Sequence, residues 1–543
     1  MTRLSRTRVR FAPDVHRGLE RGVNQIAGAI RPTLGPTPRR VGIERGMRSI
    51  APELLDDGAA IARRIIQIPD PVADPGAMYL RGMLWRLHDE LGDGSATAAV
   101  LFAALLAEGR RAIEAGIPAQ LLRGELERAG EIVCDALDRQ ATRERSQRLL
   151  TGIAASACHD VEMASLFGEV FDLIGEHGQL DIRESRRRES WAEFVEGAYW
   201  DSGALTAALF TDPVEQRSDL LDAVVVISDF AIDDPAELIP LLELTLRVGS
   251  TGLMILAKSI SERALGLISS NRDALGFPVV VVKSPGFSQT DQIDALEDLA
   301  FLLGGRPLVA AAGDKLNEIT SSDLGGARRA WATRTQFGVV HGMGDPRAKR
   351  TQIDRLANAL RNADKEPDQQ RFLNRLGKFQ GGSATIWLGG ITETETKARQ
   401  EAAKRTARVL RGAARDGVVP GGGAALIACQ PALSEARAHT TDPIEQAALR
   451  VVQRAIEAPA RTIFENAGRE AALIIDDIRR AGSSIGFDVL RGELVDMIDA
   501  GIVDSLHMLK TVVRTAIRSA ALALTIDVIV HTGKQEISVN PEG

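Results

Sequence analysis

Long helical patterns at both ends of the chain enclose a middle region of a different kind. Aliphatic residues recur at helical spacing over about residues 13–137 and again over about 417–530. Between these blocks, the runs 223–227 and 279–282 are continuous apolar segments of strand length beside helical segments, a pattern typical of buried strands in βα units. We therefore expect one helical domain built from both chain ends, with an α/β region inserted into it.

Length and composition agree with this division. The 543 residues exceed what one hydrophobic core organises, and they suggest about three domains. With 44% hydrophobic but only 4% aromatic residues, Ala, Leu, Ile and Val must fill the cores, as helix-rich proteins allow.

Composition also excludes several classes of function. A formal net charge of -7 argues against general nucleic-acid binding, which needs a surplus of Lys and Arg. The three cysteines, Cys134, Cys158 and Cys429, have no CxxC spacing and the histidines are scattered, so a disulfide scaffold and a Cys/His zinc site are not expected. Neither an apolar leader nor an uncharged apolar stretch of membrane-spanning length occurs, so the prediction is a cytoplasmic protein without a membrane partner.

The segment 91–101 (LGDGSATAAVL) is the most informative motif. Glycines at 92 and 94 let the backbone approach an anion, and Ser95 and Thr97 offer hydroxyls and amides at the positive end of a helix. Asp93 can hold a divalent cation against phosphate oxygens. The pattern therefore predicts a phosphate and metal site, although the same residues also make a plain helix N-cap.

Three further turns occur in a similar context. Thr33-Leu34-Gly35-Pro36 closes a helical pattern, Asp56-Asp57-Gly58 opens another, and the glycine-rich segment 417–423 opens a third. Each is an ordinary turn by itself. In their order and at their distances, they resemble the nucleotide pocket of bacterial group I chaperonins, the GroEL-like family.

The likeness extends over nearly the whole chain. Dispersed matches in the same order are found at 9–11 (VRF), 21–24 (RGVN), 283–287 (KSPGF), 323–325 (DLG), 381–382 (GG) and 497–504 (MIDAGIVD). We identify the chain as resembling a divergent member of that family.

The resemblance implies a multidomain chaperonin architecture of α and α/β parts. The mostly helical equatorial domain would comprise residues 1–138 and 417–543, the small α/β intermediate domain residues 139–196 and 382–416, and the α/β apical domain residues 197–381. Gly197 and the pair Gly381-Gly382 would serve as hinges, and the alternative is that they are turn glycines.

Family members form heptameric rings, one or two per particle, that bind ATP, Mg²⁺, non-native proteins and a co-chaperonin. The strand-like ends of this chain, 8–11 and 525–531, would expose edges that need a partner. The expected function is therefore that of an ATP-binding chaperone in protein folding and refolding.

The resemblance also implies the nucleotide-binding residues. Asp93 would hold magnesium, and Asp57 is one of two carboxylates implicated in hydrolysis. The other nucleotide contacts carried over from the family are Thr33, Leu34, Gly35 and Pro36 at the phosphates and base, Gly94, Ser95, Ala96 and Thr97 around the phosphates, Gly421 and Gly422 along the ribose, and Asp488, Ile502 and Asp504 near the base and sugar.

Several of these positions depart from the family pattern. The family's Lys-Gly-Arg after Leu-Gly-Pro is Thr37-Pro38-Arg39, and its Lys-Asp-Gly is Asp56-Asp57-Gly58, so a cation near the phosphates has become a carboxylate. One of three consecutive threonines is Ala96. The Asn-Ala-Ala that contacts the base is Asp488-Val489-Leu490.

The largest departure is Arg405, which stands where the family has its catalytic aspartate. Arginine cannot accept a proton at physiological pH. Loss of a general base typically costs about a hundredfold to ten-thousandfold in rate, so we expect nucleotide binding with slow hydrolysis. Alternatively, Arg405 approaches the γ-phosphate as an electrostatic clamp.

The resemblance places the polypeptide-binding face on the apical domain. Two matched positions, Ser269 and Ser270, are valines in typical members, which predicts weaker co-chaperonin binding. The other matched positions are Ala204, Ala208, Leu209, Ile239, Leu242 and Leu265. Without the resemblance, the apolar stripe that includes Ile239 and Leu242 would be interpreted as core packing.

Two other classes of function compete with this one, and the sequence favours only the first of them. One is a divergent ring subunit with a structural, holdase or regulatory role and little or no ATP hydrolysis, which the change at Arg405 favours. The other, a small-molecule enzyme with a Rossmann-type site, requires a Gly-x-Gly-x-x-Gly turn after a strand, and the segment 417–423 lacks that spacing.

Overall fold

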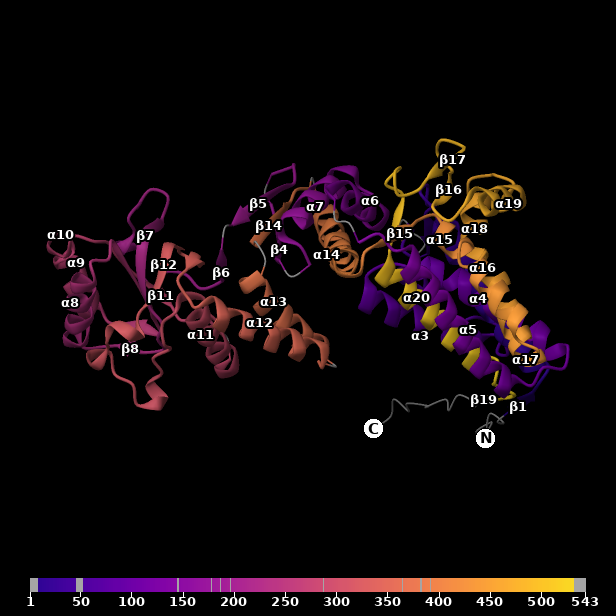
Figure 1. Ribbon diagram of the computed structural model, residues 1–543, viewed down its shortest axis with the longest axis horizontal. Coiled ribbons are helices and arrows are strands. Elements are labelled where there is room, and N and C mark those ends of the chain that lie inside the picture. The colour runs from indigo at the N-terminus through magenta and orange to yellow at the C-terminus, as the bar shows by residue number, and fades with distance from the viewer. Residues whose placement is uncertain are drawn as a thin grey trace, which may run out of the picture. The chain divides into compact units, whose positions relative to one another are not determined.

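The computed structural model describes residues 8–44, 52–143, 146–176, 178–185, 187–195, 197–286, 288–363, 365–380, 383–390 and 392–531. The chain divides into two compact units (Figure 1): unit 1 consists of Met1–Asp172 and Ile391–Gly543, and unit 2 of Leu173–Gly390. The predicted hinge pair Gly381-Gly382 lies outside the described residues. A second unit inserted into one built from both chain ends is the arrangement that the hydrophobic pattern predicted.

Unit 1 is mostly helical. Its N-terminal segment contains α1 (Asp14–Ile30), η1 (Arg31–Thr33), α2 (Gly58–Arg64), α3 (Asp74–Leu91), α4 (Ser95–Glu114), α5 (Ala119–Gln140), α6 (Gln147–Cys158) and α7 (Val161–Ile174). Its C-terminal segment contains α14 (Glu393–Asp416), α15 (Ala424–Ile427), α16 (Gln430–His439), α17 (Pro443–Ala455), α18 (Ala458–Asn466), α19 (Ala471–Ala481) and α20 (Leu506–Ala523).

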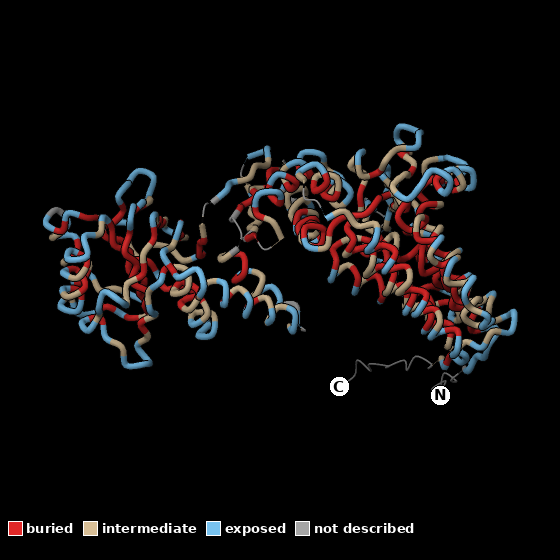
Figure 2. Tube along the Cα trace, viewed as in Figure 1, coloured by how far each residue is buried: buried red, intermediate tan, exposed pale blue. Residues whose placement is uncertain are grey.

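The core of unit 1 joins the two segments. The predicted apolar positions of α1, from Val15 to Ile30, are buried, and those of α4 pack against α20 and α17. Figure 1 shows the purple helices of the N-terminal segment beside the yellow α20, and Figure 2 shows the buried stretches of these helices along their shared faces. Aliphatic side chains dominate this core, as the composition predicted.

Short strands tie the ends of unit 1 together. β1 (Arg8–Phe11) pairs antiparallel with β19 (Val528–His531), and β15 (Val418–Pro420) pairs with β18 (Val503–Ser505). Two hairpins complete the set: β2 (Val41–Ile43) with β3 (Glu53–Leu55), and β16 (Ile485–Asp488) with β17 (Glu493–Asp496).

Unit 2 contains a six-stranded mixed sheet of order β11-β9-β7-β12-β13-β6. β7 (Arg217–Val226), β9 (Gly252–Ala257) and β11 (Val279–Lys283) run parallel, and they include both predicted apolar runs, apart from Ile227 at the end of the first. β12 (Gly325–Thr333), β13 (Phe337–Gly342) and β6 (Ala198–Trp200) add antiparallel pairings that the βα pattern did not predict.

Both faces of this sheet are covered. Val224 and Val226 pack in one cluster with α8 (Ile239–Val248) and α9 (Glu262–Ser270), while Ala223 and Val225 pack in another with α11 (Gln289–Leu303). Burial on both faces explains why these strands have continuous apolar sequences. Short elements η2 (Ala207–Leu209), β8 (Ala231–Ile232), η3 (Pro235–Leu238), β10 (Ser259–Ile260), α10 (Arg272–Leu275), η4 (Ala310–Ala312), η5 (Leu316–Glu318) and η6 (Ser321–Asp323) connect the layers.

A second sheet of unit 2 has β14 (Ser383–Leu388) between β4 (Gln179–Glu184) and β5 (Trp191–Val195), and α12 (Pro346–Arg361) and α13 (Glu366–Gln380) precede it. Gly197, the predicted hinge, has φ +84°, and a Cβ there would lie 2.1 Å from the Val339 carbonyl oxygen, so the position requires glycine. The prediction of a multidomain chain with α and α/β parts is confirmed. The finer division into three domains stays a prediction, and the residues assigned to the intermediate domain fall partly in each unit.

Candidate functional site

Two glycines shape the turn between α3 and α4. Gly92 has φ +79° and Gly94 φ +83°, a region that L side chains rarely adopt. A Cβ on Gly94 would lie 2.7 Å from the Sδ of Met508, so the turn is also closely packed. Asp93 lies between the glycines, and its carboxylate accepts a hydrogen bond of 2.6 Å from the Gly94 amide. The close packing fixes the position of this carboxylate at the start of α4.

The N-terminus of α4 carries no side-chain cap. The amides of its first turn therefore lack partners within the helix, at the positive end of the helix dipole, which suits an anion. Ser95 is buried, whereas Ala96 and Thr97 are half-buried. A Cβ on Gly58 would lie 3.0 Å from the Ser95 hydroxyl oxygen, so the turn that begins α2 lies against the same helix start.

Asp57 caps α2 and is engaged on both carboxylate oxygens. Its Oδ1 accepts a hydrogen bond of 2.7 Å from the Ala60 amide, and its Oδ2 lies 3.0 Å from Nη1 of Arg405. The Nδ1 of His88 lies 3.8 Å from Oδ1. Arg405, which stands where the resemblance implies a carboxylate, thus neutralises the charge of Asp57.

Helix α14 carries Arg405 and packs closely on the turn. A Cβ on Gly92 would lie 2.9 Å from the Arg405 carbonyl oxygen, so glycine is needed for the helix to approach. One turn further along α14, the Arg408 guanidinium donates a hydrogen bond of 2.8 Å to the Asp89 carbonyl at the end of α3. These contacts hold α14 against the end of α3.

Two acidic groups at this site hold protons more strongly than usual. Burial raises the pKa of Asp93, and the negative charge of Asp57 adds to the effect, whereas Arg405 and His159 oppose it. Burial, together with the charge of Asp93, raises the pKa of Asp504 to about 7. Carboxylates gathered in this way favour a cation among them.

The segment 33–36 lies beside the start of α4. Thr33 is buried and its hydroxyl donates a hydrogen bond of 2.8 Å to the Ile30 carbonyl, while η1 contacts α4. The Leu34 carbonyl accepts a hydrogen bond of 2.9 Å from the side-chain amide of Asn466. Gly35 has φ +115° and is half-buried, whereas Pro36 is exposed.

Pairing of β15 with β18 brings the last predicted segments together. Val419 lies opposite Asp504 in the register, and the Gly421 amide donates a hydrogen bond of 2.9 Å to the Ile502 carbonyl. Gly422 has φ +62°, and a Cβ there would lie 3.2 Å from the methyl carbon of Met497. Asp504, which lies close enough to Asp93 to raise its own pKa, connects this segment to the α3–α4 turn.

Asp488 has a different environment. Its carboxylate accepts hydrogen bonds from the amides of Leu490 (2.9 Å) and Arg491 (3.2 Å) in the hairpin between β16 and β17. Its other oxygen lies 3.5 Å from Nε of Arg491. The carboxylate therefore holds the turn and offers little to a ligand.

The predicted polypeptide-binding residues differ in exposure. Ile239 is 45% exposed, and Ser269, Ser270 and Ala208 are also exposed. Ala204 and Leu265 are half-buried, whereas Leu209 and Leu242 are buried in the core between the sheet and α8 and α9. The exposed apolar surface of α8 consists of Ile239, Leu246 and Val248.

Sequence reasoning missed three residues at the site. His88 faces Asp57, His159 acts on the pKa of Asp93, and Arg408 binds the end of α3. The position of His88, four residues before Gly92 in the last turn of α3, offered a local indication. His159 follows α6 and Arg408 lies on α14, and no sequence pattern placed them near Asp93.

Comparison of the sequence with models of known protein families shows to which family the chain belongs. The model of the TCP-1/cpn60 chaperonin family matches residues 26–238 and 249–534. The chain belongs to this family. Membership makes it a chaperonin, in a family of protein-folding chaperones, and implies binding of non-native proteins and assembly into rings.

Two negative findings apply to the described part of this chaperonin. No helix there combines the length and the apolar character needed to cross a bilayer. Within the same residues, no three His, Cys, Asp or Glu side chains are grouped as a metal site.

Proposed function

We propose that the chain is a bacterial group I, GroEL-like chaperonin subunit that binds Mg·ATP in unit 1 and hydrolyses it slowly. The observation that carries the proposal is the uncapped start of α4, flanked by the Asp93 carboxylate and by the turns at 57–58 and 33–35. Amides without partners, a positive helix end and an adjacent carboxylate make a site for a phosphate with its magnesium.

The residues present fit this ligand. Gly92 and Gly94 leave the backbone free of side chains next to α4, and the raised pKa of Asp93 and Asp504 indicates acidic groups that a divalent cation would relieve. Mg·ATP, when bound, supplies the phosphoanhydride whose hydrolysis drives chaperonin cycles. The α4 amides would orient its phosphates and Asp93 would hold the cation.

Slow hydrolysis follows from Arg405. Hydrolysis needs a group that orients the attacking water and takes its proton, and the guanidinium can accept none. The ion pair with Asp57 also engages the one carboxylate that remains of the predicted pair. These residues therefore favour binding and electrostatic stabilisation of phosphate over rapid turnover.

Ring formation is supported by the exposed face of the β1–β19 ribbon. Phe11 is 64% exposed and Val530 is 56% exposed on this two-stranded element. A two-stranded ribbon with exposed apolar side chains and free edges gains stability from further strands. We propose heptameric rings in the cytoplasm that bind non-native polypeptides through α8 and α9, with a weakened co-chaperonin contact at Ser269 and Ser270.

A second role, as a holdase or regulatory ring subunit with little hydrolysis, is favoured by the same Arg405–Asp57 contact. The two roles differ in turnover, so single-turnover ATP hydrolysis separates them.

The proposal as a whole is tested by Mg·ATP binding and native mass. We expect a ring-sized particle that binds Mg·ATP, and an Asp93→Ala variant of the same mass that loses magnesium-dependent binding. The matched control is Asp89→Ala at the end of α3, which should bind as the parent does. Unchanged Mg·ATP affinity in Asp93→Ala would place the site elsewhere, and a monomer at micromolar concentration would contradict the ring.

A further inference from the structure

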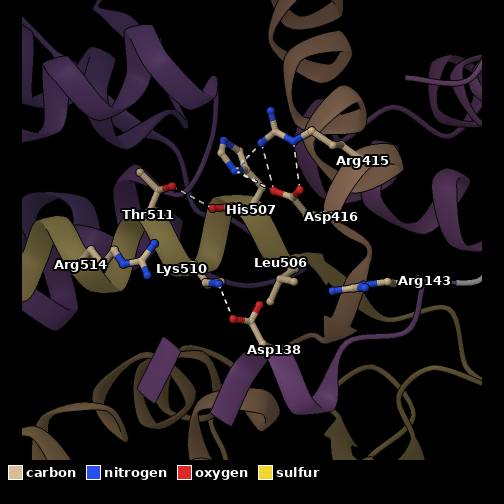
Figure 3. A pocket seen from close by; sticks show the side chains of 9 residues that line it. All are labelled: Asp138, Arg143, Arg415, Asp416, Leu506, His507, Lys510, Thr511 and Arg514. Atoms are coloured by element: carbon tan, nitrogen blue, oxygen red, sulfur yellow. Dashed lines mark hydrogen bonds and ion pairs between the residues drawn. The ribbon is translucent and has the colours of Figure 1, made fainter. Parts of the chain in front are cut away.

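A cavity of about 440 Å³ lies in unit 1 outside the proposed nucleotide site. Its nine lining residues come from the end of α5, the segment after it, the end of α14 and the first turns of α20: Asp138, Arg143, Arg415, Asp416, Leu506, His507, Lys510, Thr511 and Arg514. Figure 3 shows these side chains around the cavity. None of the nine belongs to the residues predicted to bind nucleotide.

Positive charge dominates the lining. It contains four cationic side chains and His507 but only two carboxylates, and Leu506 is the one aliphatic residue among the nine. A lining of this composition disfavours an apolar ligand. Guanidinium and ammonium groups instead supply the charged hydrogen-bond donors that oxyanions require.

Some of these cationic side chains already form ion pairs. Lys510 lies 2.5 Å from Asp138, and Arg514 lies 2.7 Å from Glu131. Asp416 accepts hydrogen bonds of 3.0 Å on both oxygens from Arg415, and one oxygen lies 3.0 Å from Nδ1 of His507. Both lining carboxylates are thus neutralised by cations of the same wall, which reduces their repulsion of an anion.

The pKa of Asp416 is consistent with this neutralisation by neighbouring cations. Burial raises its pKa, but hydrogen bonds from His507 and Arg415 outweigh burial and hold the pKa below its ordinary value. Asp416 is therefore held in its ionised form by the cations of the same wall.

Arg143 provides the free charge. Its side chain reaches toward the cavity in Figure 3, and among the residues that the structure describes it has no ion-pair partner. Gly417, with φ +96°, allows the segment that carries Arg143 to approach, because a Cβ there would lie 2.7 Å from the Thr142 carbonyl oxygen and 3.3 Å from Cγ of Arg143. An exposed guanidinium that lines a cationic cavity and has no ion-pair partner in the described part of the chain is the feature that an incoming anion would satisfy.

We propose that this cavity binds a compact polyanion of the phosphate class, separately from the nucleotide at α4. The bound anion would contact Arg143 and the cationic side chains of α14 and α20 together. Because these side chains come from three separate segments of the chain, the ligand would join the end of α14 to α20 and stabilise unit 1.

Titration calorimetry with inorganic tripolyphosphate tests the proposal on the full chain, at one fixed excess of magnesium, with and without saturating ADP. We expect one site whose affinity ADP leaves unchanged. Arg143→Ser should weaken binding roughly tenfold, the effect of one lost charge-assisted hydrogen bond, and Arg143→Lys should retain part of it.

The matched control is Arg139→Ser, an exposed arginine in the last turn of α5 that does not line the cavity. It should bind tripolyphosphate as the parent does. Arg143 is exposed, so its substitution leaves the core intact. Absence of binding at millimolar tripolyphosphate, displacement by ADP, or equal losses in the Arg143→Ser and Arg139→Ser variants would each overturn the proposal.

Discussion

The guanidinium of Arg405 lies 3.0 Å from the carboxylate of Asp57, joining the side of α14 to the N-terminus of α2. Both side chains are partly shielded from water, with exposures of 23% and 16%, so the attraction exceeds that of a surface pair. Asp57 also caps α2 through Ala60, and the contact therefore fixes a helix start and a helix side at once.

Replacing Arg405 by Asp should accelerate single-turnover ATP hydrolysis. The new carboxylate would stand near Asp57 and Asp93, where it can accept a proton from water. The gain should approach but not exceed about a hundredfold, because Asp56 and Ala96 also depart from the family pattern.

The matched variant Arg405→Ala removes the ion pair without supplying a base. It should therefore hydrolyse ATP more slowly than Arg405→Asp. Equal rates in the two variants, with ATP binding intact, would show that another residue supplies the base.

Gly92→Ala should destabilise the docking of α14. Its Cβ would lie 2.9 Å from the Arg405 carbonyl oxygen in a backbone conformation with φ +79°, at a cost on the order of 2 kcal/mol in the free energy of unfolding. Urea unfolding of the parent, of Gly92→Ala and of a Gly82→Ala control measures this loss of stability. Gly82→Ala on the exposed side of α3, where nothing lies within 4 Å, should instead stabilise by about 0.5–1 kcal/mol. Equal stabilities would contradict the close packing.

Lys378 should make the stability of unit 2 depend on pH in the alkaline range. Its ammonium lies 4.6 Å from the centre of the Trp200 ring, and burial lowers its pKa to about 8 despite the nearby Asp298 and Asp201. Between about pH 8 and 10.5 the unfolded chain therefore binds more protons than the folded chain, so stability rises with pH in this window.

Comparing the parent with Lys378→Met isolates this contribution. The variant should be more stable than the parent at pH 7, by on the order of 2 kcal/mol, and the difference should shrink toward pH 10. Thermal unfolding across this range measures it, with the exposed Lys404→Met as control. A difference that stays constant with pH would mean that Lys378 is charged in both states.

Restoring valine at Ser269 and Ser270 should strengthen co-chaperonin binding. Both serines are exposed at the end of α9, and each added valine would bury apolar area worth about 1.5 kcal/mol in a contact. Surface plasmon resonance with a co-chaperonin measures the gain. The double variant Ser321→Val/Ser322→Val, elsewhere in unit 2, controls for non-specific hydrophobic binding. Equal binding by the parent and the Ser269/Ser270 variant would remove these residues from the contact.

Local patterns predicted the elements that form the site but not how those elements meet. Periodicity located α1 and the strands around 223–227 and 279–282, and the glycines at 92 and 94 marked the turn before α4. The antiparallel strands β12 and β13 were missed because they lack a distinctive βα context. Position 405 was identified by likeness, yet its ion pair with Asp57 depends on packing between segments far apart in the chain, which no local pattern encodes.

The core of unit 1 also sets an order of events during synthesis. α4 and α5 bury apolar faces against α20. More than 360 residues separate the end of α5 at Gln140 from the start of α20 at Leu506. While unit 2 is being translated, the parts of these faces that pack on α20 stay uncovered, although α4 already has α1 and α3 as partners. A nascent chain of this chaperonin therefore exposes apolar helix surface of the kind that non-native proteins present.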